Sequence, residues 1–359
     1  MKPKALLQYL VLLFLLCHGL LWPLELKKGK IKLILHEGIG RFSMYVLSHV
    51  RDQEYVPLFV AQDPRTSGIT LVVDNKVIKL GESSQYKEEI QKTAGGASFV
   101  WTSNMLEVTQ AFKFVTSSQS ILPDGLKITL TLTNISRRSL EAGLRMFLDT
   151  YLGEDGAHHF RTDRHTEINR ELSISRDNMI QYWISPSSRE PDIGLQCMTS
   201  GQDITLPDRI VFANWKRLHD TTWRYETSSS RSFNLVPYSI NDSAACHYYN
   251  PTLIGSGASR KIVVILGNFK PGGFIVSSRE KVQPELDNLL QEAAEKAESI
   301  ESEEPSISPA AALNLINELI DQLTKKLSSG EKITDEEMKL MQEMLNELKL
   351  RSNQYSESR

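Results

Sequence analysis

Apolar and polar residues alternate along two neighbouring stretches in the middle of the chain, at 126–133 and 139–148. Such alternation is typical of β-strands that have one buried face and one wet face. A polar turn at 134–138 separates the two stretches, and a loop dense in acids and histidines follows at 149–164. The pattern therefore predicts two antiparallel strands with a polar loop at the end of their sheet.

Short runs rich in β-branched and aromatic residues continue this pattern over residues 26–276. The predicted strands are 31–35, 43–47, 55–60, 69–73, 76–80, 97–101, 107–115, 127–133, 144–148, 179–184, 194–198, 209–215 and 261–266. Asp74-Asn75 lies between two of them and predicts a two-residue hairpin turn. Many short strands with turns between them favour a sandwich or a barrel over a βαβ sheet. We therefore expect a mainly β fold, a large antiparallel two-sheet β-supersandwich over residues 26–276.

The hydrophobic period changes from strand-like to helical at about Ser278. Apolar residues spaced three and four apart predict helices at 280–300, at 310–327 and from Thr334 onward. The last two are joined by a short polar loop and form an αα-hairpin. We expect a C-terminal α-helical hairpin extension over 279–350, followed by a disordered tail at 351–359.

Each helical stripe of apolar residues must be buried against something. One possibility is that the helices pack on each other and on the β body. The other is that they dock a protein partner or a second copy of the chain. The residues expected to make that contact are Leu313, Ile316, Leu323, Met338, Met341 and Leu345.

The first residues are typical of an export signal. Lys2 and Lys4 precede an almost unbroken apolar run at 10–16, so we expect a signal peptide over residues 1–23. An uncleaved membrane anchor is the alternative, because the apolar stretch is about as long as a bilayer is thick. Either interpretation places the protein in the periplasm or the cell envelope.

The formal net charge of −3 gives no indication of non-specific nucleic-acid binding. The charge is unevenly spread, because residues 281–359 carry a net −8 and leave +5 on the rest of the chain. Beyond the signal, Cys197 and Cys246 are the remaining cysteines, and no CxxC motif is present. They could form a disulfide in an oxidising compartment or remain two buried thiols.

The loop at 149–164 contains the candidate ligand-binding residues Asp149, Glu154, Asp155, His158 and His159. Carboxylates beside histidines can bind a metal or move protons. No HEXXH or EF-hand pattern is present, and adjacent histidines on an extended strand point to opposite faces. We therefore expect no metal, no cofactor and no catalytic residue. Whether the loop binds Ca²⁺ or another ligand, or only satisfies its own backbone, stays open.

Two tryptophans, Trp215 and Trp223, form a second candidate ligand-binding group. Exposed aromatic rings would stack on sugars, whereas buried ones would fill a sandwich core. Because Val211 and Trp215 are evenly spaced along a predicted strand, the core is favoured for Trp215.

Four sequence motifs carry a resemblance to a known group of proteins. They are LTLTNIS at 130–136, AGLRMFLDTYLGEDGAHHF at 142–160, LPDRIVFANW at 206–215 and AACHYYNP at 244–251. This pattern resembles a group of bacterial envelope proteins that are similar to the galactose-mutarotase-like β-supersandwich. The helical tail after an exported β body looks like a spirochaete-type periplasmic protein. The resemblance implies a place among the structural parts assembled around the periplasmic flagellar motor.

The leading hypothesis is a non-enzymatic periplasmic structural or assembly protein, whose β body and helical tail mediate protein–protein interaction. The alternative is a carbohydrate-binding or mutarotase-like protein of the cell envelope, with the 149–164 loop and the two tryptophans as glycan contacts. A third possibility is a Ca²⁺-dependent adhesion module.

Overall fold

The computed structural model describes residues 23–48, 54–93, 95–117, 120, 122–156, 158–270 and 274. The chain divides into two compact units, Met1–Val276 and Ser277–Arg359, and the described residues all belong to the first. The expected signal, the helical hairpin with its partner-contacting residues, and the tail lie outside the described residues and stay predictions. Within the described ranges, no helix is both long and apolar enough to cross a membrane.

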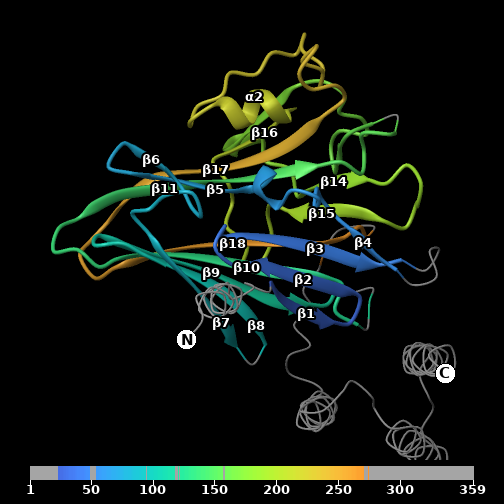
Figure 1. The fold of residues 1–359 in the computed structure, drawn as a ribbon. Coiled ribbons are helices and arrows are strands. Elements are labelled where there is room, and N and C mark those ends of the chain that lie inside the picture. The colour runs from blue at the N-terminus through green and yellow to red at the C-terminus, as the bar shows by residue number, and fades with distance from the viewer. Residues whose placement is uncertain are drawn as a thin grey trace, which may run out of the picture. The chain divides into compact units, whose positions relative to one another are not determined.

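The described unit is built almost entirely of strands (Figure 1). The strands are β1 (Leu24–Lys28), β2 (Ile31–His36), β3 (Arg41–Leu47), β4 (Tyr55–Pro57), β5 (Gly68–Val73), β6 (Lys76–Lys79), β7 (Lys87–Thr93), β8 (Gly96–Thr102), β9 (Leu106–Val115), β10 (Gly125–Asn134), β11 (Leu140–Thr150), β12 (Arg161–Thr162), β13 (Leu172–Ser175), β14 (Tyr182–Pro186), β15 (Gly194–Met198), β16 (Arg209–Asn214), β17 (Ser243–Ile254) and β18 (Ser259–Asn268). The short helices are η1 (Pro64–Thr66), η2 (Arg176–Asn178) and α2 (Trp215–Asp220).

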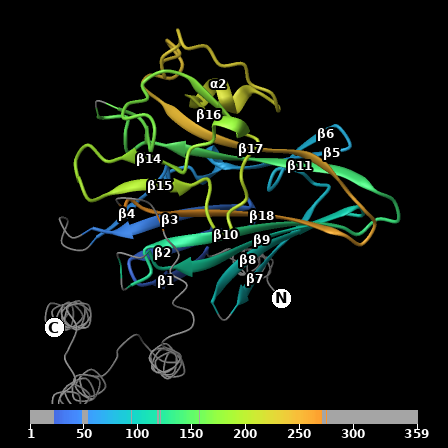
Figure 2. The same cartoon turned by 180° about the vertical axis from the view of Figure 1, so that it is seen from behind.

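The strands form three antiparallel sheets. Their orders are β1-β2-β3-β4, then β12-β14-β15-β18-β10-β9-β8-β7, and β13-β16-β17-β11-β5-β6. The expected mainly β antiparallel sandwich is therefore confirmed, but the expected number of two sheets is wrong. Strands β1 to β4 pair only with one another and make a separate sheet. Figures 1 and 2 show the six-stranded and eight-stranded sheets facing each other, and residues from all three sheets share one hydrophobic core.

Strand β10 has the alternating burial that its sequence predicts. The prediction of one wet face is wrong for β11, where Glu141 is the single exposed residue. The inner face of β11, with Leu144, Met146 and Leu148, belongs to the core between the sheets. Its outer face is buried as well, because a second layer of the chain covers it.

That second layer is residues 215–242, here called the cover segment, which connects β16 to β17. It begins with α2, and the Asn214 side chain accepts a hydrogen bond from the Arg217 N–H at 3.2 Å and so caps the helix. Figure 1 shows α2 lying over the six-stranded sheet. The sheet and the cover segment meet in a second hydrophobic cluster, which includes Phe147, Val211, Cys246, Tyr248, Leu218 and Tyr225. Cys246 in this cluster and Cys197 in the main core are both free thiols.

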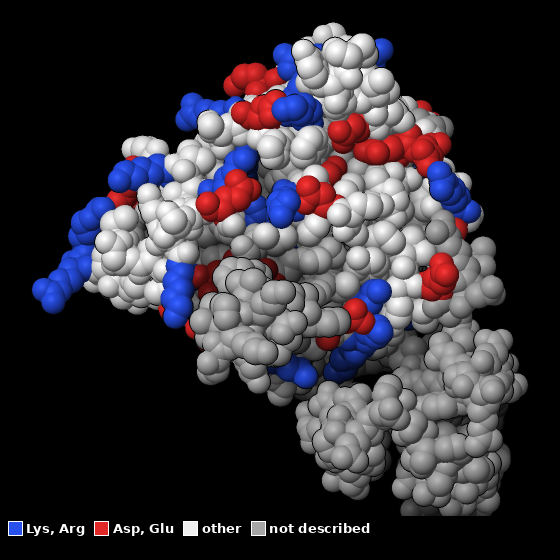
Figure 3. Space-filling model, in the orientation of Figure 1, with Lys and Arg blue, Asp and Glu red and all other residues white. Residues whose placement is uncertain are grey.

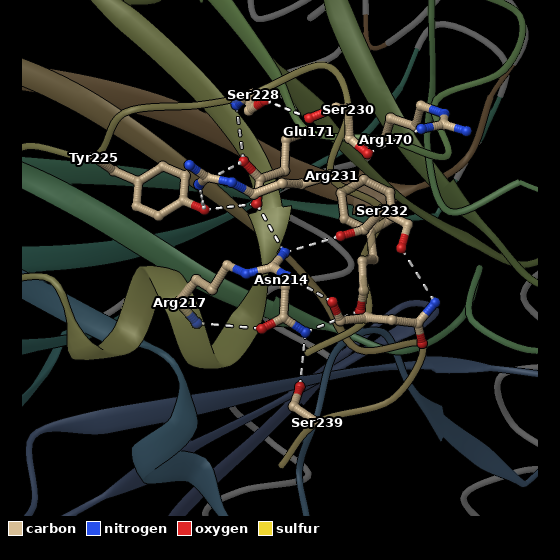
Figure 4. Close-up of polar contacts among 12 residues, drawn as sticks. Arg170, Glu171, Asn214, Arg217, Tyr225, Ser228, Ser230, Arg231, Ser232 and Ser239 are labelled. Carbon is tan, nitrogen blue, oxygen red and sulfur yellow. Dashed lines mark hydrogen bonds and ion pairs between the residues drawn. The ribbon is translucent and has the colours of Figure 1, made fainter. Parts of the chain in front are cut away.

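A buried carboxylate, that of Glu171, holds the cover segment in place (Figure 4). Its side chain is 0% exposed and forms ion pairs with Arg217 at 2.9 Å and Arg231 at 3.4 Å. The Tyr225 hydroxyl donates to the same carboxylate at 2.6 Å, and the Ser228 N–H donates at 3.1 Å. All four partners belong to the cover segment, so one side chain next to β13 anchors it at four points.

Replacing Glu171 with glutamine should destabilise the fold. The change keeps the side-chain volume but leaves the two arginines without their buried counter-charge, which costs roughly 2–4 kcal/mol. Chemical denaturation should show this loss in the free energy of unfolding. Glu226→Gln is the matched control, because Glu226 is an exposed acid of the same segment. Equal stability of the two variants would contradict the anchoring role of Glu171.

Candidate functional site

A row of polar side chains crosses the outer face of the six-stranded sheet. Lys79 of β6 lies opposite Thr70 of β5, and Thr70 lies opposite Arg145 of β11. Arg145 is in turn paired with Tyr248 of β17, and Tyr248 with Arg209 of β16. Directly opposed residues of antiparallel strands point to the same face, so three basic residues share the face that the cover segment protects.

Arg209 and Arg145 differ in how their guanidinium groups are used. Arg209 lies over the Tyr248 ring at 4.5 Å and donates to the Tyr225 carbonyl at 3.1 Å, so it supports the cover segment. Arg145 is only 2% exposed, and its Nη2 donates to the Thr221 carbonyl at 2.7 Å. Its Nε and Nη1 are buried and form no hydrogen bond of normal geometry, although the buried Tyr248 hydroxyl interacts with the same guanidinium. Arg145 therefore carries unused donors at a site that is otherwise covered.

Arg145 lines a shallow, solvent-open hollow, whose enclosed volume is only about 20 Å³. A ligand would therefore lie largely on the surface, with no more than a small group entering the hollow. Its charged or ionisable lining residues are Arg41, Arg65, Lys79, Glu82, Arg145 and His219. Elsewhere on the face shown in Figure 3, basic and acidic side chains are interspersed. The hollow thus concentrates positive charge that the surrounding surface does not.

An aromatic stack forms one side of the hollow. The His219 ring lies 4.8 Å from the Trp215 ring, at an interplanar angle of 23°. Trp215 is itself fixed, because its Nε1–H donates to the Thr66 carbonyl at 3.0 Å. The imidazole is therefore held against a rigid support and presents a flat surface to a ligand.

Arg41 is the most tightly held cation of the hollow. Its Nη1 donates to the carbonyls of Leu80, Ile39 and Gly40, and its Nη2 donates to Glu82 at 2.9 Å. The side chain passes close to Gly68, where an added Cβ would lie 2.7 Å from the Arg41 Nε. Arg41 is therefore held in place at both of its Nη atoms, and only its buried Nε has no hydrogen-bond partner, whereas Arg145 has two such nitrogens.

The acidic loop at 149–164 does not reach this hollow. Asp149 is the penultimate residue of β11, and Glu154 accepts a hydrogen bond from the Ser243 N–H at 2.8 Å. Burial raises the pKa of both carboxyl groups to about 8, and the nearby Asp242 adds to the effect on each. Both are therefore largely protonated at neutral pH, and they form a buried pair of neutral acids.

The other candidate residues of the 149–164 loop each contact a different partner. Asp155 forms an ion pair with Arg189, and His158 lies 3.1 Å from Glu167. His159 is buried against Phe233 and hydrogen-bonded to Asn241 at 3.0 Å. Burial lowers the pKa of His159. In the described part of the chain, no three histidine, cysteine or acidic side chains are grouped so as to hold a metal ion.

Of the two tryptophans, only Trp215 is part of the hollow's support. It begins α2 and does not end a strand, and it packs partly buried against the second hydrophobic cluster. Trp223 packs edge-on against Tyr248, with ring centroids 5.6 Å apart. The sequence interpretation missed Arg145, although an arginine inside the apolar run Leu144–Leu148 is a signal for an unusual buried charge.

No protein-family model and no curated protein matches the chain. Among solved structures, a galactose mutarotase-like protein from Lactobacillus casei is similar over 69% of this chain and 100% of its own, with 10% identity and a TM-score of 0.41. A galactose mutarotase related enzyme from Lactobacillus acidophilus is similar over 69% of this chain and 97% of its own, with 8% identity and a TM-score of 0.41. A 4-alpha-glucanotransferase from Thermococcus litoralis is similar over 69% and 39%, with 7% identity and a TM-score of 0.32. These are likenesses of β-sandwich architecture, and at such values they carry no argument about ligand or activity.

The protonated acids predict how stability changes with pH. The folded-state pKa of Asp149 and of Glu154 lies near 8, above the unfolded value near 4. Their contribution to stability is therefore fully present below about pH 4 and is lost as pH rises through about 8. The double variant Asp149→Asn, Glu154→Gln should gain stability relative to the wild type between about pH 5 and pH 9. Since each unit of pKa shift corresponds to about 1.4 kcal/mol per group, the gain should be on the order of several kcal/mol across this window, measured by denaturation at each pH.

Burial lowers the pKa of His159, so this residue changes stability with pH in the opposite direction to the two acids. It does so equally in the variant and the wild type, and the difference in stability between the two proteins therefore isolates the carboxyl groups. Asp155→Asn is the control, since Asp155 is an exposed member of the same loop. A double variant whose stability relative to the wild type does not change with pH would contradict the protonated state.

Proposed function

We propose that the β body is a carbohydrate-binding protein and that its ligand is an acidic saccharide, whose anionic group enters the basic hollow beside Arg145. The observation that carries this proposal is the pair of unused, buried Arg145 donors. This is the alternative function expected from the sequence, at a site that the sequence did not identify.

The energetics of Arg145 favour an anionic ligand. A buried donor without a partner costs about 1–3 kcal/mol, and more when the group is charged. Hydrogen bonds between a guanidinium and an oxyanion are short and about twice as strong as neutral ones. A carboxylate, sulfate or phosphate in the hollow would recover that cost if the neighbouring side chains shift to expose the Arg145 Nε or Nη1, which are sealed from solvent in the free protein. Arg65 would add to the attraction, because it is exposed at the hollow and forms no ion pair with a carboxylate of the described residues.

The rest of the lining suits a sugar that carries the anion. The aromatic surface of His219 on Trp215 offers a face for the C–H side of a pyranose ring. Thr70 and Ser67 add hydroxyl groups to the lining. The open side of the hollow leaves room for the remainder of a longer saccharide.

The site is proposed to bind its saccharide without catalysing a reaction. Proton transfer on a sugar needs an acid and a base in reach of one ligand. Among the described lining residues, Glu82 is the one carboxylate, and it is already engaged with Arg41. With the export signal expected at residues 1–23, the proposed site of action is the cell envelope. Assembly through the helical tail stays a prediction about residues outside the described ranges.

Substitution of Arg145 should abolish most of the binding. With glucuronate as the probe, isothermal titration calorimetry should show at least tenfold weaker binding for Arg145→Met, since a hydrogen-bonded charge contributes about 1.5–3 kcal/mol. Arg65→Met should weaken it about threefold, and its exposed position should leave folding intact. Arg137→Met is the matched control, because Arg137 is exposed and lies outside the hollow.

Neutral glucose should bind much more weakly than glucuronate to the wild type. Equal binding of the two sugars, or equal binding of glucuronate by the Arg145 and Arg137 variants, would rule out this site. Polarimetry of freshly dissolved galactose tests catalysis separately. If the protein accelerates anomer exchange, its function is mutarotation and not binding alone.

A further inference from the structure

Glu82 is an acid placed among the cations of the hollow. It follows Gly81, whose φ of +78° and close approach to the Ile39 carbonyl admit only glycine. An added Cβ at Gly81 would lie 1.9 Å from that carbonyl oxygen. The turn between β6 and β7 is therefore fixed so that Glu82 stands at the rim of the hollow.

The Glu82 carboxylate neutralises one side of the hollow. Its Oε1 accepts from the Arg41 Nη2 at 2.9 Å, and its Oε2 lies 3.8 Å from the Lys79 Nζ. Arg145, in contrast, forms no ion pair with a carboxylate of the described residues, and two of its nitrogens form no hydrogen bond of normal geometry. A ligand anion bound at Arg145 therefore shares the hollow with one carboxylate, that of Glu82, which is paired with Arg41 and Lys79.

We infer that Glu82 is a specificity-determining residue, which weakens the preference of the net positive hollow for dianionic sugars over monoanionic ones. A uronate or a sulfate ester carries one negative charge, whereas a phosphate monoester carries about −1.5 to −2 at neutral pH. This inference rests on the proposed function, because it concerns the same anion at Arg145.

This weakening follows from the charge dependence of Coulomb energy. Repulsion by Glu82 grows in proportion to the ligand charge. The Glu82 side chain is 48% exposed, so solvent and salt screen the interaction, and a modest penalty of about threefold in affinity per ligand charge is expected. A dianion then suffers about the square of that penalty, or roughly tenfold.

The test compares three sugars that differ in charge: glucose, glucuronate and glucose 6-phosphate. Calorimetry at about pH 7.5 and constant ionic strength should show that Glu82→Gln strengthens glucuronate binding about threefold and glucose 6-phosphate binding about tenfold. Binding of neutral glucose should not change. Glutamine can still accept the hydrogen bond from Arg41, so the wall of the hollow is kept. Glu141→Gln, an exposed acid outside the hollow, is the matched control.

The outcomes separate this inference from the proposed function. Equal strengthening of both anions, or none, overturns the role of Glu82 while Arg145-dependent binding stands, since a purely structural effect would not follow ligand charge. Absence of anion binding by the wild type overturns the proposed function and this inference with it.

Discussion

The site depends above all on the buried Glu171 carboxylate. Its four contacts tie the cover segment to the outer face of the six-stranded sheet. That segment contributes both the Thr221 carbonyl, which binds Arg145, and His219, which lines the hollow. If the anchor is lost, Arg145 becomes hydrated and its donors are no longer reserved for a ligand. The contacts of Glu171 therefore help to fix two parts of the hollow, although Glu171 itself is not among the lining residues.

The six-stranded sheet is covered on both faces, and this changes the residue pattern of its central strands. Strands β11 and β17 are buried on both sides, so their sequences lose the alternation that marks a half-exposed strand. A charged residue on such a strand must find partners or remain costly. The Arg209 guanidinium lies over the Tyr248 ring and donates to the Tyr225 carbonyl. The Arg145 guanidinium has hydrogen-bond partners for only some of its nitrogens. Unmet hydrogen-bonding capacity at a rigid position is a form of preorganisation for a ligand.

The sequence predicted those parts of the fold that depend on residues close together in the chain, such as strand alternation and short turns. Strand β10 shows its alternation, and Asp74-Asn75 forms the expected hairpin turn with positive φ at both residues. Strand β17 was missed, because its burial on both faces hides the period and Asn250-Pro251 resembles a turn; the pairing with β11 shifts register close to that point. The hollow could not be predicted either. It joins Arg41, Glu82, Arg145 and His219, which only the tertiary fold brings together.

The electrostatic potential at Arg145 also depends on the acids near the end of β11. Arg145, Phe147 and Asp149 point to the same face, and Asp149 lies about 13 Å along the strand from Arg145. Because burial keeps Asp149 and Glu154 largely protonated at neutral pH, the end of the strand adds little negative charge near the hollow. Ionised carboxylates there would reduce the positive potential that attracts an anion, through a protein interior that screens less than water does. Burial of the two acids therefore preserves the positive potential around Arg145.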